Sequence, residues 1–399
     1  MSRETPWAVL MCKFKDDQRS FVTINRQDVE AMFTAPDIEN VVTFWRDVSY
    51  GELDLSGSKV FGWLTLDQKQ QDFQDALANL GKDKARAAMF SWAQKAASDA
   101  GIKLDPYYGV TVYMSTQTDL WGVLQGSTGQ VVCDIASSLP QILQEYGHAY
   151  GLQHSRSVID PTDYTNPFCI MSGMSFGVNN DDGTSHDPRF IGHDPTFPSR
   201  FGPSGPGLCS PYLSQAGWLP PLRTRQVVSN GTYPETTILK LSALGEFGAA
   251  FPQAAIIEFG SPQSLTYFIE YRRGGWDRGI IYNPIVVHQL RADKYSYFAG
   301  YIRTVTTGMT GIGAMPAQLA GRWYVDAQFD LSVEFLSLVD DGAAVLIRIA
   351  PAAAGRDLSV RTIANSTLRL SGAFSIKTQV LSPGESSVRD KLIFLLGQE

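Results

Sequence analysis

The sequence predicts an α+β fold in which a domain of mixed strands and helices precedes an all-β domain. Residues 7–115 alternate strand-like and helix-like apolar patterns. From residue 237 onward, short apolar segments recur between turns that contain Gly and Asp, which is typical of a β-sandwich. Pro220-Pro221 lies between these two parts. We therefore expect domains at residues 1–222 and 223–352, with residues 353–399 as a C-terminal extension that can also belong to the β-domain.

The elements of the first part follow from their apolar patterns. Residues 7–14 and 109–114 predict strands, and residues 82–100 predict a strong helix. A further strand is expected from residue 129, running into a loop that ends near residue 138. Residues 211–222 predict a short helix that closes this domain. In the second part we expect strands at residues 237–241, 255–259, 266–271, 280–290, 331–336 and 344–349.

The helix after residue 138 carries the most specific motif of the chain. Ser137 or Ser138 can cap it, and Pro140 suits its first turn. Gly151 is suited to end it, because glycine adopts left-handed backbone angles without steric cost. We therefore predict a helix that starts near residue 139 and ends just before Gly151.

The spacing along this helix predicts a metal site. Gln144 and His148 lie four residues apart, on one face of a helix, so both can point at one ion. The bend at Gly151 can return His154 to the same place. Glu145 projects beside the ion, where a carboxylate can take a proton from a metal-activated water. The pattern matches H-E-x-x-H-x-x-G-x-x-H except at its first position, where Gln144 stands for histidine.

Several segments together resemble a known family. Residues 144–155 followed by Cys169-Ile170-Met171-Ser172 resemble metzincin-like zinc metallopeptidases, in particular the immune-inhibitor-A-like group. Residues 44–57 resemble a segment upstream of that group's site. Residues 267–273, 275–277 and 285–288 are similar to its β-domain downstream.

This resemblance implies a secreted-type zinc endopeptidase. Its protease domain would contain a twisted mixed sheet, the active-site helix and a methionine turn. Gln144, His148 and His154 would be the zinc ligands and Glu145 the general base. Met171 would form the methionine turn, with Met174 as the second choice.

The chain departs from the family in the first ligand. An amide oxygen is neutral, like an imidazole, but zinc accepts it less readily, so we expect weaker affinity. His186 and His193, in the loop at residues 178–206, are alternative ligands or solvated loop residues. Asp160 and Asp163 are candidate oxygen ligands or turn-forming residues.

Two further features bear on the proposed site. The tyrosine that some metzincins place after the methionine turn is missing, because Phe176 follows Ser175. His288 lies in an apolar run, which indicates a core or strand histidine. Arg272, Arg273 and Trp276 form either a binding face or a solubilising rim of the β-domain.

Composition limits the partners and the compartment. The 399 residues carry a net charge of −7, which argues against a nucleic-acid partner. No apolar run reaches the roughly eighteen residues of a membrane span. The first residues lack a signal-peptide pattern, so localisation is left open, although the resemblance implies secretion. Cys169 and Cys209 flank the loop after the helix and can pair in an oxidising compartment.

We therefore expect a zinc-dependent hydrolase that cleaves the peptide bonds of a protein or peptide substrate. The competing hypothesis is a catalytically inactive, metalloprotease-like scaffold that binds a protein or glycan through its cleft or its β-domain. The sequence does not specify the oligomeric state.

Overall fold

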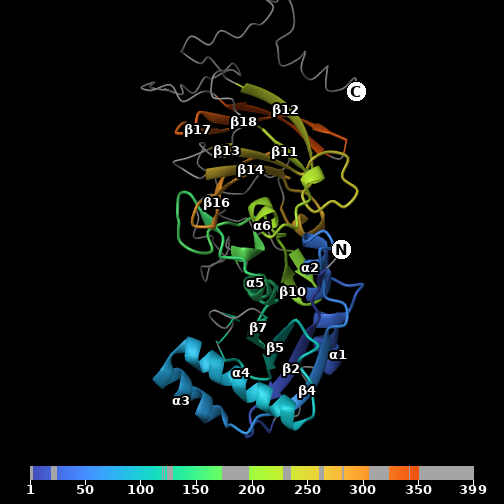
Figure 1. Ribbon diagram of the computed structural model, residues 1–399, viewed down its shortest axis with the longest axis vertical. Coiled ribbons are helices and arrows are strands. Elements are labelled where there is room, and N and C mark those ends of the chain that lie inside the picture. Colours follow the sequence, from blue (N-terminus) through green and yellow to red (C-terminus); the bar gives the residue numbers. More distant parts are fainter. Residues whose placement is uncertain are drawn as a thin grey trace, which may run out of the picture.

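The computed structural model describes residues 3–18, 25–118, 120, 122–123, 129–172, 197–227, 235–259, 265–280, 283–304, 323–340 and 342–349. It confirms a mixed α and β architecture with several sheets and few helices. In Figure 1 the helices α3 and α4 lie at one end of the elongated molecule and the C-terminal strands at the other. Helix α5 lies between them. The predicted extension at residues 353–399 is outside the described residues.

The N-terminal sheet has five strands in the order β4-β2-β5-β7-β6. Strands β4, β2, β5 and β7 are parallel, and β6 is antiparallel to β7. Both faces of the sheet are covered, which explains the continuous apolar runs of its strands. The strands are β2 (Trp7–Lys13), β4 (Lys59–Thr65), β5 (Gly109–Met114), β6 (Gly122–Val123) and β7 (Gln130–Asp134).

Helices cover the two faces of this sheet unequally. One face packs against α1 (Arg26–Thr34), α2 (Val41–Val48) and α5 (Leu139–Ala149). The other packs against α3 (Gln70–Leu80) and α4 (Lys82–Asp99). The helix predicted at residues 82–100 is confirmed. A small parallel pair, β1 (Arg3–Glu4) and β3 (Leu53–Asp54), completes this part.

Short elements connect α5 to the C-terminal sheets. They are β8 (Arg156–Ser157), η1 (Ile170–Ser172), β9 (Phe197–Ser199), β10 (Gly202–Ser204), α6 (Ser210–Gln215) and η2 (Pro221–Arg223). The helix expected at residues 211–222 is shorter than predicted. Gly217, with φ of +73°, ends it, and the following Pro220-Pro221 pair starts a separate 3-10 turn.

The C-terminal part contains two sheets that share one hydrophobic cluster. The six-stranded sheet has the order β11-β13-β14-β15-β16-β8 and the four-stranded sheet the order β12-β19-β18-β17. The first comprises, besides β8, β11 (Thr224–Gln226), β13 (Ala254–Phe259), β14 (Leu265–Tyr271), β15 (Ile285–Leu290) and β16 (Ser296–Ile302). The second comprises β12 (Glu235–Ser242), β17 (Trp323–Asp326), β18 (Leu331–Val339) and β19 (Gly342–Ile349). The 3-10 turn η3 (Gly275–Asp277) follows β14.

The six-stranded sheet reaches back to the segment that follows α5. Strand β8 pairs in parallel with β16, with Arg156 opposite Tyr297 and Ser157 opposite Phe298. Strand β8 lies only two residues after His154. The C-terminal sheet therefore contacts the segment that carries the candidate ligands.

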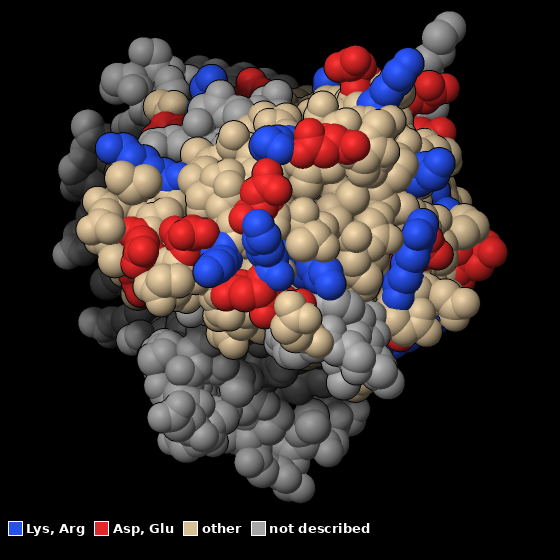
Figure 2. Space-filling view, turned by 90° about the horizontal axis from the view of Figure 1, so that it is seen from below, with Lys and Arg blue, Asp and Glu red and all other residues tan. Residues whose placement is uncertain are grey.

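The surface carries charges of both signs. Figure 2 shows positive and negative side chains interspersed on the face seen from below. No helix among the described residues is long and apolar enough to cross a bilayer.

Candidate metal site on helix α5

Helix α5 begins and ends as the sequence predicts. Ser138 is the residue before its first turn, and its backbone N–H donates to Gln141 Oε1 at 2.8 Å. Pro140 lies in the first turn. At the other end, Gly151 has φ of +91°, and Leu152 N–H donates back to the Gly147 carbonyl at 3.0 Å. The chain therefore turns back toward the helix directly after its last turn.

Met171 packs directly beneath α5. It lies in η1 and is fully buried. A Cβ atom added at Gly147 would lie 2.2 Å from Met171 Sδ and 3.2 Å from Trp45. Helix and methionine therefore approach as closely as a glycine at position 147 permits. The second choice for this position, Met174, lies outside the described residues.

The imidazoles of His148 and His154 converge, with ring centroids 4.5 Å apart and planes at 75°. His148 Nδ1 is 2.8 Å from the Leu152 carbonyl oxygen, and His154 Nδ1 is 2.9 Å from Asp163 Oδ2. Because both of these oxygens are acceptors, each Nδ1 carries the hydrogen. Each Nε2 then keeps its lone pair for a ligand.

The carboxamide of Gln144 faces the same imidazole nitrogen. Its Nε2 is 3.3 Å from His148 Nε2, and the side chain is buried. A half-turn of the amide group exchanges its nitrogen and oxygen in nearly the same positions. The amide oxygen of Gln144 can therefore take the place beside His148 that the motif requires.

Burial keeps the His148 imidazole neutral. Desolvation, and secondarily the proximity of His154, lower the pKa of His148 to about 4. A neutral imidazole is the form that binds a metal. His148 is therefore in its ligand form throughout the neutral range of pH.

Asp163 orients His154. Its second oxygen, Oδ1, accepts a hydrogen bond from Arg156 Nε at 2.7 Å. Although burial favours the neutral acid, the hydrogen bonds from His154 and Arg156 hold the pKa of Asp163 below its usual value. This arrangement is the carboxylate–histidine pair that accompanies metal-binding histidines. Asp160, the other candidate oxygen ligand, accepts hydrogen bonds from Thr162 and serves the turn.

Tyr164 lies at this site, although the sequence motif does not include it. Its ring centroid is 4.2 Å from that of His154, and its hydroxyl hydrogen-bonds with the Gln144 side chain. Desolvation and the nearby Glu145 carboxylate raise its pKa, so the hydroxyl stays protonated. Its φ of +70° is unusual for a side chain of this size. No periodicity signals this residue, because only the return of the loop brings it near α5.

Glu145 lies on α5, directly after Gln144 and three residues before His148. It is partly exposed, and its charge affects the pKa of Cys133 on one side and of Tyr164 on the other. The carboxylate therefore lies within electrostatic reach of the Tyr164 hydroxyl, near the proposed ligands.

A buried network attaches the ligand-bearing loop to the C-terminal sheet. Asn166 Nδ2 donates to Ser155 Oγ at 2.7 Å and to His288 Nε2 at 3.0 Å. His288 Nδ1 lies 3.6 Å from Glu270 Oε1. His288 lies in β15 and is fully buried, so its prediction as a strand or core histidine is confirmed.

Arg272 continues this network, and its expected place on a surface is wrong. It is fully buried and forms ion pairs with Glu270 at 2.7 Å and with Asp277 at 2.6 Å. Two carboxylates compensate the desolvated guanidinium, so this charge is retained inside the protein. Arg273 is exposed, whereas Trp276 is partly buried and its Nε1 donates to Asp47 at 3.2 Å.

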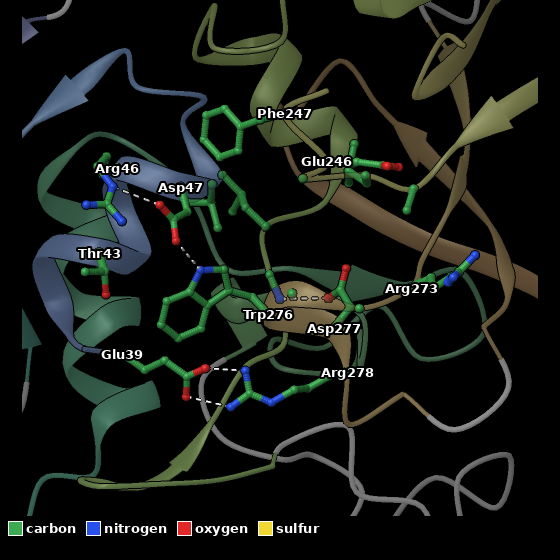
Figure 3. A pocket seen from close by; sticks show the side chains of 18 of the residues that line it. Glu39, Thr43, Arg46, Asp47, Glu246, Phe247, Arg273, Trp276, Asp277 and Arg278 are labelled. Carbon is green, nitrogen blue, oxygen red and sulfur yellow. Dashed lines mark hydrogen bonds and ion pairs between the residues drawn. The ribbon is translucent and has the colours of Figure 1, made fainter. Parts of the chain in front are cut away.

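A cleft of about 760 Å³ lies elsewhere, between α2 and loops of the C-terminal part (Figure 3). Trp276 lies within it, and Arg278 forms an ion pair with Glu39 across it. None of Gln144, Glu145, His148 and His154 lines this cleft. The cleft is therefore separate from the candidate metal site.

The candidate set rests on three side chains. Within the described ranges, no group of three or more His, Cys, Asp and Glu residues could hold a metal. The candidate set has only two ligands of these types, His148 and His154, and its third ligand is the amide of Gln144. The alternative ligands His186 and His193 lie outside those ranges. The candidate ligands that the structure brings together are thus Gln144, His148 and His154.

Neither known family models nor curated proteins match this chain.

We expect Gly147→Ala to destabilise the protein. Alanine favours a helix by about 1 kcal/mol relative to glycine. Here, however, the new methyl group would force the buried Met171 side chain to move, at a cost of about 1–3 kcal/mol. Urea unfolding measures the net change. Gly248→Ala is the matched control, because a Cβ at Gly248 meets no atom within 4 Å. A Gly147→Ala protein that is more stable than this control would contradict the close packing of Met171 against Gly147.

We expect His288→Gln to reduce the loss of stability in acid. Burial, with a smaller effect of Arg272, lowers the pKa of His288 from 6.5 to about 4. The unfolded chain therefore binds a proton between these values that the folded protein does not. Stability falls as the pH decreases through this window, by up to about 1.4 kcal/mol per pH unit for one histidine. The free energy of unfolding, measured with urea between pH 7 and pH 4, should fall more steeply with decreasing pH in the wild type than in His288→Gln. An identical pH dependence in the two proteins would contradict this role of His288.

Proposed function

We propose that this protein is a zinc-dependent endopeptidase with a metzincin-like protease domain followed by a β-sandwich. The observation that carries the proposal is the orientation of His148 and His154. Both Nδ1 atoms are held by acceptors, which directs both Nε2 lone pairs to a metal. Met171 beneath α5 and the shared core of the two C-terminal sheets support the fold assignment.

His148, His154 and Gln144 would hold the zinc. All three are neutral donors, so the ion would keep its full positive charge. When bound, zinc would supply Lewis acidity that activates a water and polarises the substrate carbonyl. Asp163 supports the site by fixing the tautomer of His154, with Arg156 holding the far oxygen of the carboxylate.

Glu145 is the general base in this proposal. It neighbours the ligands on α5, and its side chain is partly exposed, so a substrate and a water can approach it. The carboxylate takes a proton as the water attacks the scissile carbonyl, and then returns it to the leaving amine.

Tyr164 is the group that we assign to the developing oxyanion. Its raised pKa keeps the phenol protonated, and the hydrogen bond that its oxygen accepts from Gln144 places the hydroxyl beside the proposed ligands. A protonated donor aimed at the site where negative charge develops stabilises the transition state more than the ground state. Tyr164 thus supplies a hydroxyl that the sequence lacks directly after its methionine turn.

A protein or peptide is the substrate that suits this site. Ile159 and Tyr164, on the loop that follows His154, are 65% and 38% exposed. Tyr164 lies beside the proposed ligands, and the exposed Ile159 is on the same loop, so both side chains offer contacts to the side chains of an extended peptide.

The alternative is a catalytically inactive scaffold that binds a protein or glycan. The replacement of one histidine by Gln144 favours it, as does the separate cleft around Trp276, which is lined by charges of both signs. Zinc content and cleavage distinguish the two hypotheses.

We expect purified protein to bind one zinc ion and to cleave an unfolded protein substrate. Glu145→Gln should keep the zinc but lower kcat by about 10²–10⁴-fold, because only the proton acceptor is lost. His148→Ala should lose the zinc. Elemental analysis and a fluorogenic casein assay measure both. Glu30→Gln, an exposed change in α1, is the matched control and should leave both unchanged.

Two outcomes would contradict this proposal. One is a protein that stays metal-free and inactive in excess zinc, which favours the scaffold. The other is full activity in Glu145→Gln. Gln144→His tests the third ligand separately, because an imidazole should tighten zinc binding. Unchanged affinity would show that Gln144 is not a ligand.

We expect Tyr164→Phe, assayed in excess zinc, to lower kcat by about 10²-fold with little change in KM, because an oxyanion donor acts in the transition state. Steady-state kinetics on a peptide measures the two constants separately. Tyr295→Phe is the control, since Tyr295 stacks on Arg156 nearby without touching the proposed ligands. An unchanged kcat in Tyr164→Phe would show that Tyr164 does not stabilise the oxyanion. It would not affect the role proposed for Glu145.

A further inference from the structure

Two buried cysteines are in contact next to the methionine beneath α5. Cys169 directly precedes η1, and Cys209 is the residue before α6. Both are free thiols, and they hydrogen-bond with each other. The backbone amides of Cys209 and Met171 also donate to the Cys169 sulfur. The two segments also lie side by side, since Ile170 N–H donates to the Gly207 carbonyl at 3.1 Å.

The other two cysteines do not share this arrangement. Cys12 lies in β2 and Cys133 in β7, with β5 between them. Two strand spacings amount to about 10 Å, which exceeds the roughly 7 Å between Cα atoms that a disulfide tolerates. Their side chains also belong to hydrophobic clusters on opposite faces of the sheet. Cys12 and Cys133 should therefore stay unpaired under oxidising conditions, which makes them an internal control.

We propose that Cys169 and Cys209 form a disulfide bond in an oxidising environment. With oxidised glutathione as the oxidant, the Cys169 thiolate attacks one of its sulfurs and releases one reduced glutathione. Cys209 then loses its proton and attacks the Cys169 sulfur of the mixed disulfide, releasing the second. Two thiols are oxidised, one glutathione disulfide is reduced to two thiols, and one sulfur–sulfur bond replaces another at each step.

The bond would tie η1 to the start of α6. Met171 lies two residues after Cys169 and packs against Gly147 of the helix that carries the ligands. Oxidation would therefore fix the segment that supports α5. Closing a loop of about 40 residues predicts an increase in Tm of roughly 5 °C for a chain of this size. This inference concerns the thiols alone and is independent of zinc and of catalysis.

The test is to refold the full chain in oxidised and reduced glutathione and then to count thiols in denaturant. Of the four thiols, two should disappear on oxidation. Peptide mapping without reductant should find Cys169 linked to Cys209. Cys169→Ala should keep all of its remaining thiols and lose the increase in Tm, whereas Cys12→Ala should retain both the linkage and the increase.

Two results would overturn the proposal. One is four titratable thiols after refolding with oxidised glutathione. The other is a linkage that involves Cys12 or Cys133. Peptide mapping of the wild type decides both, even if a cysteine variant fails to fold.

Discussion

The two hydrogen bonds at the Nδ1 atoms of His148 and His154 are the constraint on which the candidate site depends. An imidazole can rotate and can exchange tautomers, so spacing along a helix does not by itself present a lone pair to an ion. The Leu152 carbonyl and the Asp163 carboxylate remove both freedoms. The first acceptor is available because Gly151 turns the chain, and the second because the following loop returns to α5.

The C-terminal sheet holds that loop in place. Asn166 bonds to Ser155 and His288, and His288 in turn lies against the ion pair of Glu270 and Arg272. Burying these groups is costly unless each one is paired, so the network is stable only when the two parts of the chain are packed together. The order of the ligand-bearing loop therefore depends on residues more than a hundred positions away.

Local signals predicted the local structure. Ser138, Pro140 and Gly151 placed the ends of α5 because capping acts within a few residues. Short apolar segments likewise predicted strands such as β5 and β19. Tyr164 and the burial of Arg272 could not be predicted in this way, since their environments come from segments distant in sequence. The interpretation of Arg272 as a surface residue was wrong because arginine is usually exposed, and its partner Asp277 becomes recognisable only once η3 is folded.

The glutamine in the motif is best understood through its neighbours. A carboxamide is a weaker zinc donor than an imidazole, so a site that uses one needs its donors placed in advance. Gln144 is buried, contacts His148 and donates a hydrogen bond to the Tyr164 oxygen, which leaves its carboxamide little freedom. The Gln144 side chain is therefore already ordered, so zinc binding would remove little further conformational entropy from it. Tyr164 would then have two roles in the proposed enzyme, holding the weakest ligand and offering its hydroxyl to the oxyanion. A change at position 144 should alter both metal affinity and the placement of that hydroxyl, because one hydrogen bond couples them.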